Sequence, residues 1–129
     1  MRLIEGKSGL VASTLTFAQV GAVADKAWRE QRDALIECID MAQVGDEERM
    51  KAIRKHLELR GTRLPALMHA MTIAGASDIV ETACRAQRLD FARFTAEMTA
   101  DELTTTAAQL VGAELDRTVS EGKGVAAVV

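Results

Sequence analysis

Few residues of this chain have the types and spacing that nucleotide binding, metal binding or catalysis requires. Gly6, Lys7 and Ser8 are the residue types that close a phosphate-binding loop. That loop also needs a strand leading into it and a glycine five residues before Gly6, a position that Met1 occupies here. We therefore interpret the segment as a glycine-bracketed turn and predict no nucleotide site.

The side chains best suited to bind a soft metal ion are Cys38, His56, His69 and Cys84. No two of them have the short spacing with which one helix or knuckle presents a pair of ligands to zinc. Both cysteines fall on apolar stripes, so we expect packed, unreactive thiols. We predict no metal site, no cofactor and no catalytic residue, although a catalytic group assembled only in space stays an alternative.

The bulk composition narrows the classes of function. The 129 residues carry a net charge of −3 and only four aromatic side chains, which disfavours nucleic-acid binding by phosphate neutralisation or base stacking. The chain shows no secretory leader, and its longest apolar stretch, residues 64–76, is too short to cross a membrane. We expect a cytoplasmic protein without a membrane partner.

Hydrophobic periodicity predicts an all-α fold of about five helices in a compact bundle, built as one domain over residues 1–129. Residues 1–15 form an arm or a short β-hairpin, and residues 123–129 form a tail. The helices are expected at about 17–43, 46–60, 64–74, 78–96 and 100–121.

Helix ends are predicted from capping residues. Thr16 with Gln19 and Thr99 with Glu102 match the capping-box pattern. Gly45, Gly61, Gly75 and Gly122 are expected to end helices, and Pro65 suits a first helical turn. After Gly75, the next helix is expected to be capped by Ser77 or Asp78.

The second and third predicted helices carry apolar residues on two sides. In the second, Met50, Ile53 and Leu57 form one stripe, and Ala52 and Leu59 lie nearly opposite. The other predicted helices have too few apolar stripes to cover both sides of the second and third helices. We therefore predict a protein-interaction surface, used in a homo-oligomer or a stable hetero-complex, at these residues: Ala52, Leu59, Ala66, Ala70 and Ile73. In the alternative, the bundle encloses the third helix completely.

A helix-turn-helix DNA-binding module is a less favoured interpretation. Its recognition helix would span residues 77–88, but Asp78 and Glu81 at the leading end would repel phosphates. Residues 49–63 are rich in cations, but Glu47 and Glu48 come directly before them and Glu58 lies among them. A solvated helix face is the favoured interpretation.

The beginning of the chain resembles the small tail-assembly chaperones of tailed bacteriophages. The matching residues are Ile4 and Gly6 in a possible hairpin turn, followed by Leu-Thr-Phe-Ala-Gln-Val at residues 15–20. The resemblance implies a non-catalytic, self-associating helical protein that binds the tape-measure or tail-tube protein in the host cytoplasm. A head–tail connector or other virion subunit, and a cellular helical adaptor or DNA-binding regulator, remain open.

Overall fold

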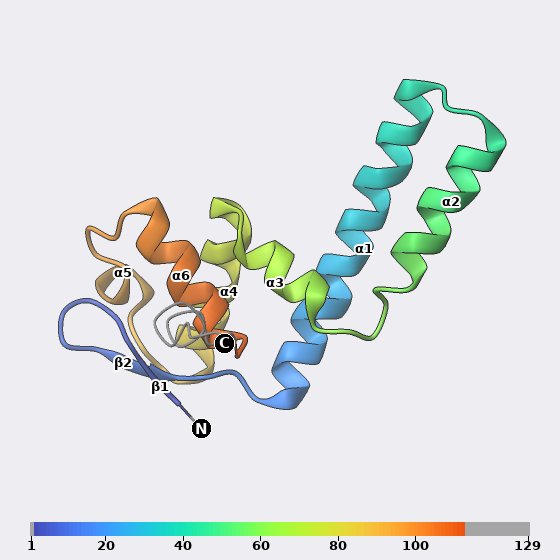
Figure 1. Cartoon of the computed structure of the whole chain (residues 1–129). Helices are drawn as coiled ribbons and strands as arrows, with labels where there is room; N and C mark the ends of the chain where they lie inside the picture. The colour runs from blue at the N-terminus through green and yellow to red at the C-terminus, as the bar shows by residue number, and fades with distance from the viewer. Residues whose placement is uncertain (1, 113–129) are drawn as a thin grey trace, which may run out of the picture. The chain divides into compact units, whose positions relative to one another are not determined.

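A computed structural model describes residues 2–112. Over these residues the chain forms a two-stranded hairpin and six helices (Figure 1), which confirms the predicted all-helical class with a short N-terminal hairpin. The elements are β1 (Leu3–Glu5), β2 (Val11–Ser13), α1 (Phe17–Ala42), α2 (Asp46–Leu57), α3 (Leu64–Ala70), α4 (Ile73–Ala86), α5 (Phe91–Phe94) and α6 (Ala100–Leu110).

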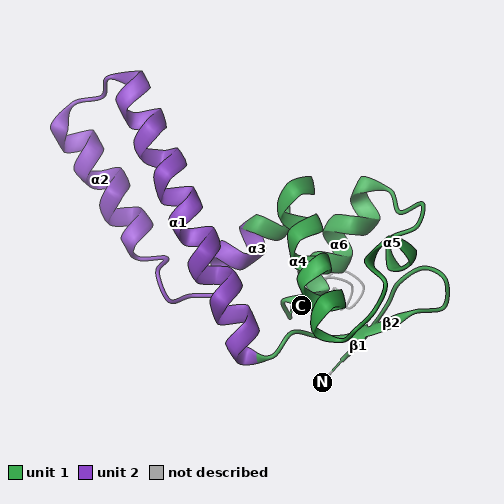
Figure 2. Ribbon diagram, turned by 180° about the vertical axis from the view of Figure 1, so that it is seen from behind, with its two compact units in different colours: residues 1–16, 69–129 green, residues 17–68 purple. Residues whose placement is uncertain are grey.

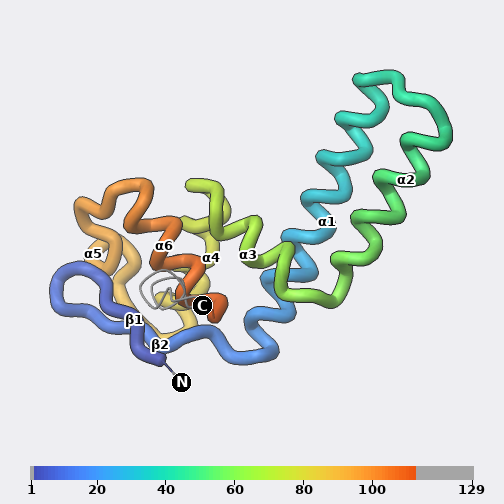
Figure 3. Tube along the Cα trace, in the orientation of Figure 1, coloured from blue at the N-terminus to red at the C-terminus, as the bar shows by residue number. Residues whose placement is uncertain are grey.

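The chain divides into two compact units, coloured separately in Figure 2. Unit 1 contains the described residues 2–16 and 69–112, and unit 2 contains residues 17–68. The path can be followed in Figure 3: the chain leaves unit 1 after β2, forms α1, α2 and most of α3, and then enters α4. Each unit is described by itself, and the single domain expected over residues 1–129 stays a prediction.

The core of unit 1 lies between α4, α5, α6 and the hairpin. Its fully buried side chains include Ile79, Val80, Phe94 and Leu110. The hairpin is antiparallel and pairs Ile4 with Ala12, and both of these side chains are buried. Alternation along each strand thus turns one face of the hairpin toward the core, as a half-buried strand pair requires.

Polar contacts fix the hairpin to the helices of unit 1. Ser13 N–H and Oγ both donate to Gln87 Oε1, at 2.8 and 3.0 Å, and Gln87 Nε2 donates to the Ser13 carbonyl at 3.0 Å. Lys7 N–H donates to the Phe94 carbonyl at 2.8 Å. A Cβ at Gly6 would overlap the Phe94 ring, so the turn needs glycine there for close approach.

The boundary between α3 and α4 corrects the sequence prediction. The third helix was expected to reach residue 74 and the next to be capped by Ser77 or Asp78, but α3 ends at Ala70 and Thr72 caps α4. Thr72 Oγ1 accepts from Gly75 N–H at 3.0 Å. Gly75 therefore lies inside the first turn of α4 and does not end a helix.

The fourth predicted helix, expected to reach about residue 96, is divided in the structure. It ends at Ala86, and Asp90 caps the short α5 by accepting from Arg93 N–H at 3.2 Å. Arg88 has a φ of 58°, and Leu89 N–H donates to the Cys84 carbonyl at 2.8 Å. This is the bonding pattern of a Schellman stop, with arginine at the position that glycine usually occupies.

The predicted capping box of α6 is confirmed. Thr99 N–H donates to Glu102 Oε1 at 2.9 Å, and Glu102 N–H donates to Thr99 Oγ1 at 3.1 Å. The helix ends at Leu110, before the end predicted near Gly122. The expected continuation over residues 113–121, and the tail at 123–129, lie outside the described residues.

Unit 2 is built on the α1–α2 hairpin. The first helix matches its predicted range to within one residue, but α2 ends at Leu57 instead of about residue 60. From Leu59 onward, turn bonds replace helical ones: Leu59 N–H donates to the His56 carbonyl and Thr62 N–H to the Leu59 carbonyl, each at 3.1 Å. The chain then turns at Gly61, whose φ is 81°.

Candidate protein-interaction surface

The five residues predicted to form an interface differ in exposure. Ala66 and Ala70 are fully buried, Ala52 and Leu59 are half-buried, and only Ile73 is largely exposed, at 62%. The apolar residues of α2 that are most exposed are instead Met50 and Leu57, at 53% and 52%. Sequence periodicity found both stripes of α2 but could not tell which one α1 would cover.

The exposed stripe of α2 continues onto α1. Ile36 is 39% exposed, and Leu35 and Ile53 are half-buried. Leu35, Ile36, Ile53 and Leu57 line one common hollow, and Met50 lies on the same side of α2 because it precedes Ile53 by three residues and Leu57 by seven. We call this set the hairpin face: Leu35, Ile36, Met50, Ile53 and Leu57.

The hollow in the hairpin face has a volume of about 80 Å³, and four of its lining residues are aliphatic. Trp28, Arg32 and His56 complete its walls. His56 is the only buried residue of α2, so α2 buries little apolar surface. A protein interior would fill such a space with a neighbouring side chain.

A reciprocal contact between Trp28 and His56 joins the two helices below this hollow. Trp28 Nε1 donates to the His56 carbonyl at 2.9 Å, and His56 Nε2 lies 3.0 Å from the Trp28 carbonyl. The rings stack with centroids 4.8 Å apart. The Arg32 and Arg60 guanidinium carbons lie 5.6 and 5.0 Å from the indole centroid, within cation–π range. Trp28 thus organises the base of the hairpin.

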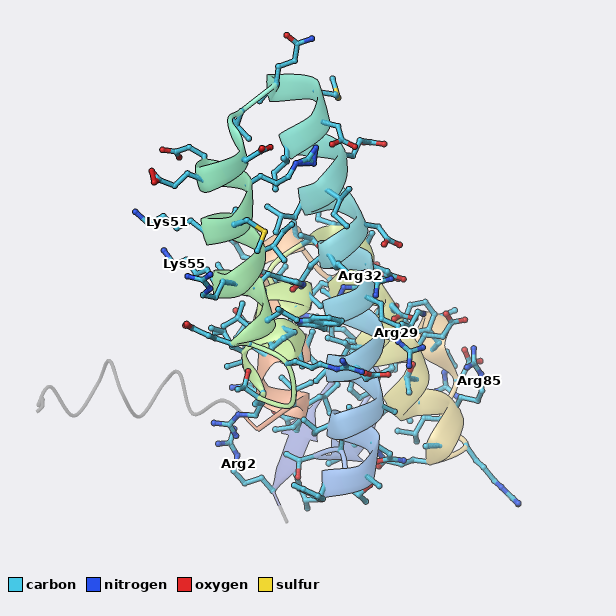
Figure 4. All side chains as sticks on the ribbon, turned by 90° about the vertical axis from the view of Figure 1, so that its right-hand side faces the viewer. Arg2, Arg29, Arg32, Lys51, Lys55 and Arg85 are labelled. Carbon is cyan, nitrogen blue, oxygen red and sulfur yellow. The ribbon has the colours of Figure 1, made fainter. Side chains whose placement is uncertain are left out.

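Charge along the hairpin is segregated. Residues 37–48, which we call the tip segment, contain five carboxylates and no cation. Residues 49–60, the basic segment, contain five cations and one carboxylate. Arg49 Nη1 donates to Asp40 Oδ1 at 2.9 Å across the top of the hairpin. Figure 4 shows Lys51 and Lys55 extending from α2 away from α1.

A second hollow in unit 2, of about 310 Å³, opens beside the indole of Trp28. Phe17, Val20 and Ala24 contribute apolar wall, and Arg60 and Arg63 contribute charge. Phe17 is 96% exposed. The combination of an apolar wall with guanidinium groups suits contact with another protein, in which aromatic and arginine side chains supply much of the binding free energy.

The two cysteines have different environments. Cys84 is buried as predicted, and burial, with a smaller contribution from the Asp90 charge, raises the pKa of its thiol. Cys38 is exposed, so the prediction of a packed thiol was wrong there. The reason is that α2 covers only one side of α1. Ile39, the residue after Cys38, lies on the covered side and is buried.

The histidines serve separate structural contacts. His56 pairs with Trp28, and His69 Nε2 lies 3.2 Å from Asp78 Oδ2 in unit 1. Over residues 2–112, histidine, cysteine, aspartate and glutamate form no group of three that could hold a metal ion. None of the helices in this described part is both long and apolar enough to cross a membrane.

Comparisons with protein families, with curated proteins and with solved structures found no match for this chain.

Proposed function

We propose that this protein is a non-catalytic assembly factor that works through protein–protein contact at the hairpin face. The observation that carries the proposal is the exposure of Ile36, Met50 and Leu57 around an apolar hollow on two neighbouring helices. Single exposed apolar residues are ordinary on a monomer. A contiguous set with an unfilled hollow is typical of a binding surface.

The process that we propose is bacteriophage tail assembly in the host cytoplasm, with the tape-measure or tail-tube protein as partner. The support is the resemblance at the start of the chain. Ile4 and Gly6 lie in an N-terminal hairpin and α1 begins two residues after Leu15, in the order that the tail-assembly chaperones have. A head–tail connector or another subunit kept in the virion is the alternative within the same class.

A DNA-binding regulator is less well supported by the structure. The helix expected to read base edges begins at Ile73, and its first residues are Ile73, Ala74 and Gly75. None of these side chains offers a hydrogen bond to a base edge, which sequence-specific reading in the major groove requires. The cations of α2 could attract phosphates, but the carboxylates of the tip segment lie on the same hairpin.

The test is a binding assay with matched variants. The proposal places the gene between those for a tail-tube and a tape-measure protein, and these two products are the partners to co-express. We expect Met50→Glu to abolish capture of the partner, because it places a charge in the hairpin face. Met71→Glu replaces a methionine that is 76% exposed but lies outside that face, and it should bind normally. Capture of neither partner by the unsubstituted protein, or equal capture by both variants, contradicts the proposal.

A further inference from the structure

The distribution of charge on the hairpin restricts what can cover the hairpin face. In the tip segment, Glu37, Asp46, Glu47 and Glu48 make no ion pair within residues 2–112. In the basic segment, Lys51, Arg54 and Lys55 make none within the same residues. The hairpin therefore carries unpaired charges of both signs, separated along its length.

We infer that the hairpin face binds the hairpin face of a second copy of this chain, with the two hairpins antiparallel. This inference rests on the proposed function and names one of its partners. In an antiparallel pair related by a two-fold axis, the tip segment of each copy lies against the basic segment of the other. Both sets of unpaired charges are then neutralised, and the two apolar faces cover one another.

A parallel arrangement of two copies would bring like charges together. It would place the carboxylates of one tip segment beside those of the other, and like charges in contact disfavour association. Antiparallel pairing avoids this and makes a four-helix arrangement from two hairpins, which is a common way for paired helices to bury one apolar stripe each. The complementarity is internal to one sequence, so a second copy of the chain satisfies it without any other protein.

The hollow in the hairpin face fits the same arrangement. Its volume of about 80 Å³ is of the order needed for one aliphatic side chain, and Met50 is a flexible residue on the same face. In a two-fold pair, any side chain that enters the partner's hollow does so twice. One favourable insertion therefore contributes two contacts to the dimer.

The first experiment measures association of the full chain by light scattering across a range of concentrations. We expect a monomer–dimer equilibrium that Leu57→Glu and Met50→Glu both shift to monomer, and that Met71→Glu leaves unchanged. Both substituted face residues are about half exposed, so helix content measured by circular dichroism should be retained. A clean monomer at every concentration overturns the inference.

A charge swap tests the antiparallel direction. Reversal of the tip segment by Glu47→Lys with Glu48→Lys should raise the dissociation constant roughly tenfold, since several exposed ion pairs are lost together. Adding Lys51→Glu and Lys55→Glu to the same chain restores opposite charges on the two segments and should restore association. If the fourfold variant stays as weak as the double variant, charge pairing between the segments is refuted.

Spin-label distances report the direction independently. In a Cys38→Ser background, a label at Val44 marks the tip and a label at Lys51 marks the body of α2. With antiparallel hairpins whose two-fold axis crosses the middle of α2, the two tips are separated along the direction of the helices by on the order of 18 Å, the length of α2. The Val44 pair should therefore be farther apart than the Lys51 pair. A short Val44 distance would show parallel pairing and overturn the inference.

The two proposals fail in different ways. If the chain is monomeric but captures a tail protein, and Met50→Glu abolishes that capture, the second copy is not the occupant and the proposed function stands. If the chain dimerises as inferred but binds neither tail protein, the dimer stands and the process proposed for it is wrong.

Discussion

At the scale of single residues, Trp28 does more for unit 2 than its apolar area alone would suggest. Its ring stacks on His56, its Nε1 donates across to the His56 carbonyl, and two guanidinium groups lie over its faces. The sequence indicated an apolar position on the first helix. It could not reveal the partner, because His56 lies 28 residues away and histidine alone has no preferred partner.

We predict that Trp28→Phe lowers the free energy of unfolding by about 1 kcal/mol, the usual loss for one hydrogen bond, since phenylalanine can keep the stacking. Trp28→Ala should cost roughly 3–5 kcal/mol, because it also leaves a cavity. Urea unfolding followed by circular dichroism measures both. Phe17→Ala is the matched control, since Phe17 is 96% exposed and its removal should cost little. Equal losses for all three variants would contradict the role given to Trp28.

Glu102 is the residue for which pH dependence can be predicted. Its pKa is lowered mainly by the hydrogen bond from Lys7 Nζ, 2.8 Å from Oε2, and next by the bond from Thr99 N–H. A lowered pKa means that the carboxylate stabilises the folded state above the ordinary glutamate pKa. That contribution is lost as the pH falls through the lowered value.

A titration followed by nuclear magnetic resonance should therefore give Glu102 a pKa below that of an unpaired glutamate. Lys7→Met should raise this pKa part of the way, because the capping bond from Thr99 remains. Arg85→Met is a suitable control, since its ion pair is with Glu81 and not with Glu102. A Glu102 pKa that Lys7→Met leaves unchanged would show that the lysine contact does not persist in solution.

At the scale of helices and turns, a prediction was confirmed where the sequence pattern that determines the structure lies within a few residues. The capping box at Thr99 and Glu102 is complete within four residues, and it formed as predicted. The end of α4 could not be predicted from a glycine, because Arg88 adopts the left-handed conformation there. The hairpin turn at Gly6 depends on Phe94, which no local pattern connects with it.

Two glycines inside helices provide a direct test of why α4 begins where it does. A Cβ at Gly75 would overlap the His69 carbonyl oxygen, whereas a Cβ at Gly21 meets nothing within 4 Å. We predict that Gly75→Ala destabilises unit 1 despite the better helix propensity of alanine. Gly21→Ala should stabilise α1 by about 0.5–1 kcal/mol, because it gains that propensity without a clash.

Thermal unfolding of the two variants decides the point. The expected result is a lower midpoint for Gly75→Ala and a slightly higher one for Gly21→Ala. If both substitutions raise the midpoint, Gly75 is an ordinary helical position and the close approach of the His69 carbonyl is not maintained.

At the scale of the whole molecule, the sequence predicted that some apolar residues would be left without a partner inside the chain. The prediction placed them on the Ala52 and Leu59 side of α2, nearly opposite the stripe of Met50, Ile53 and Leu57. In unit 2, His56 is the only buried residue of α2, and Met50 and Leu57 of that stripe are about half exposed. Periodicity gives the faces of a helix, but the choice between them depends on how many neighbours the fold supplies.

The same asymmetry predicts how stability is distributed along the chain. Six residues of α4 are buried, against one in α2. Backbone amides protected by few buried contacts open at lower free energy and exchange sooner with solvent. Hydrogen exchange of the dilute protein should therefore be faster in α2 than in α4, and α4 should exchange only with unfolding of unit 1.

Raising the protein concentration adds a second expectation to this measurement. Binding stabilises whatever part of the native state it covers, by mass action. If the hairpin face is the contact between copies, exchange in α2 should slow as the concentration rises, while exchange in α4 stays constant. Met50→Glu should remove that dependence, and Met71→Glu should keep it. An α2 as protected as α4 in dilute solution would contradict the argument from burial, and a uniform slowing in both helices would place the contact elsewhere.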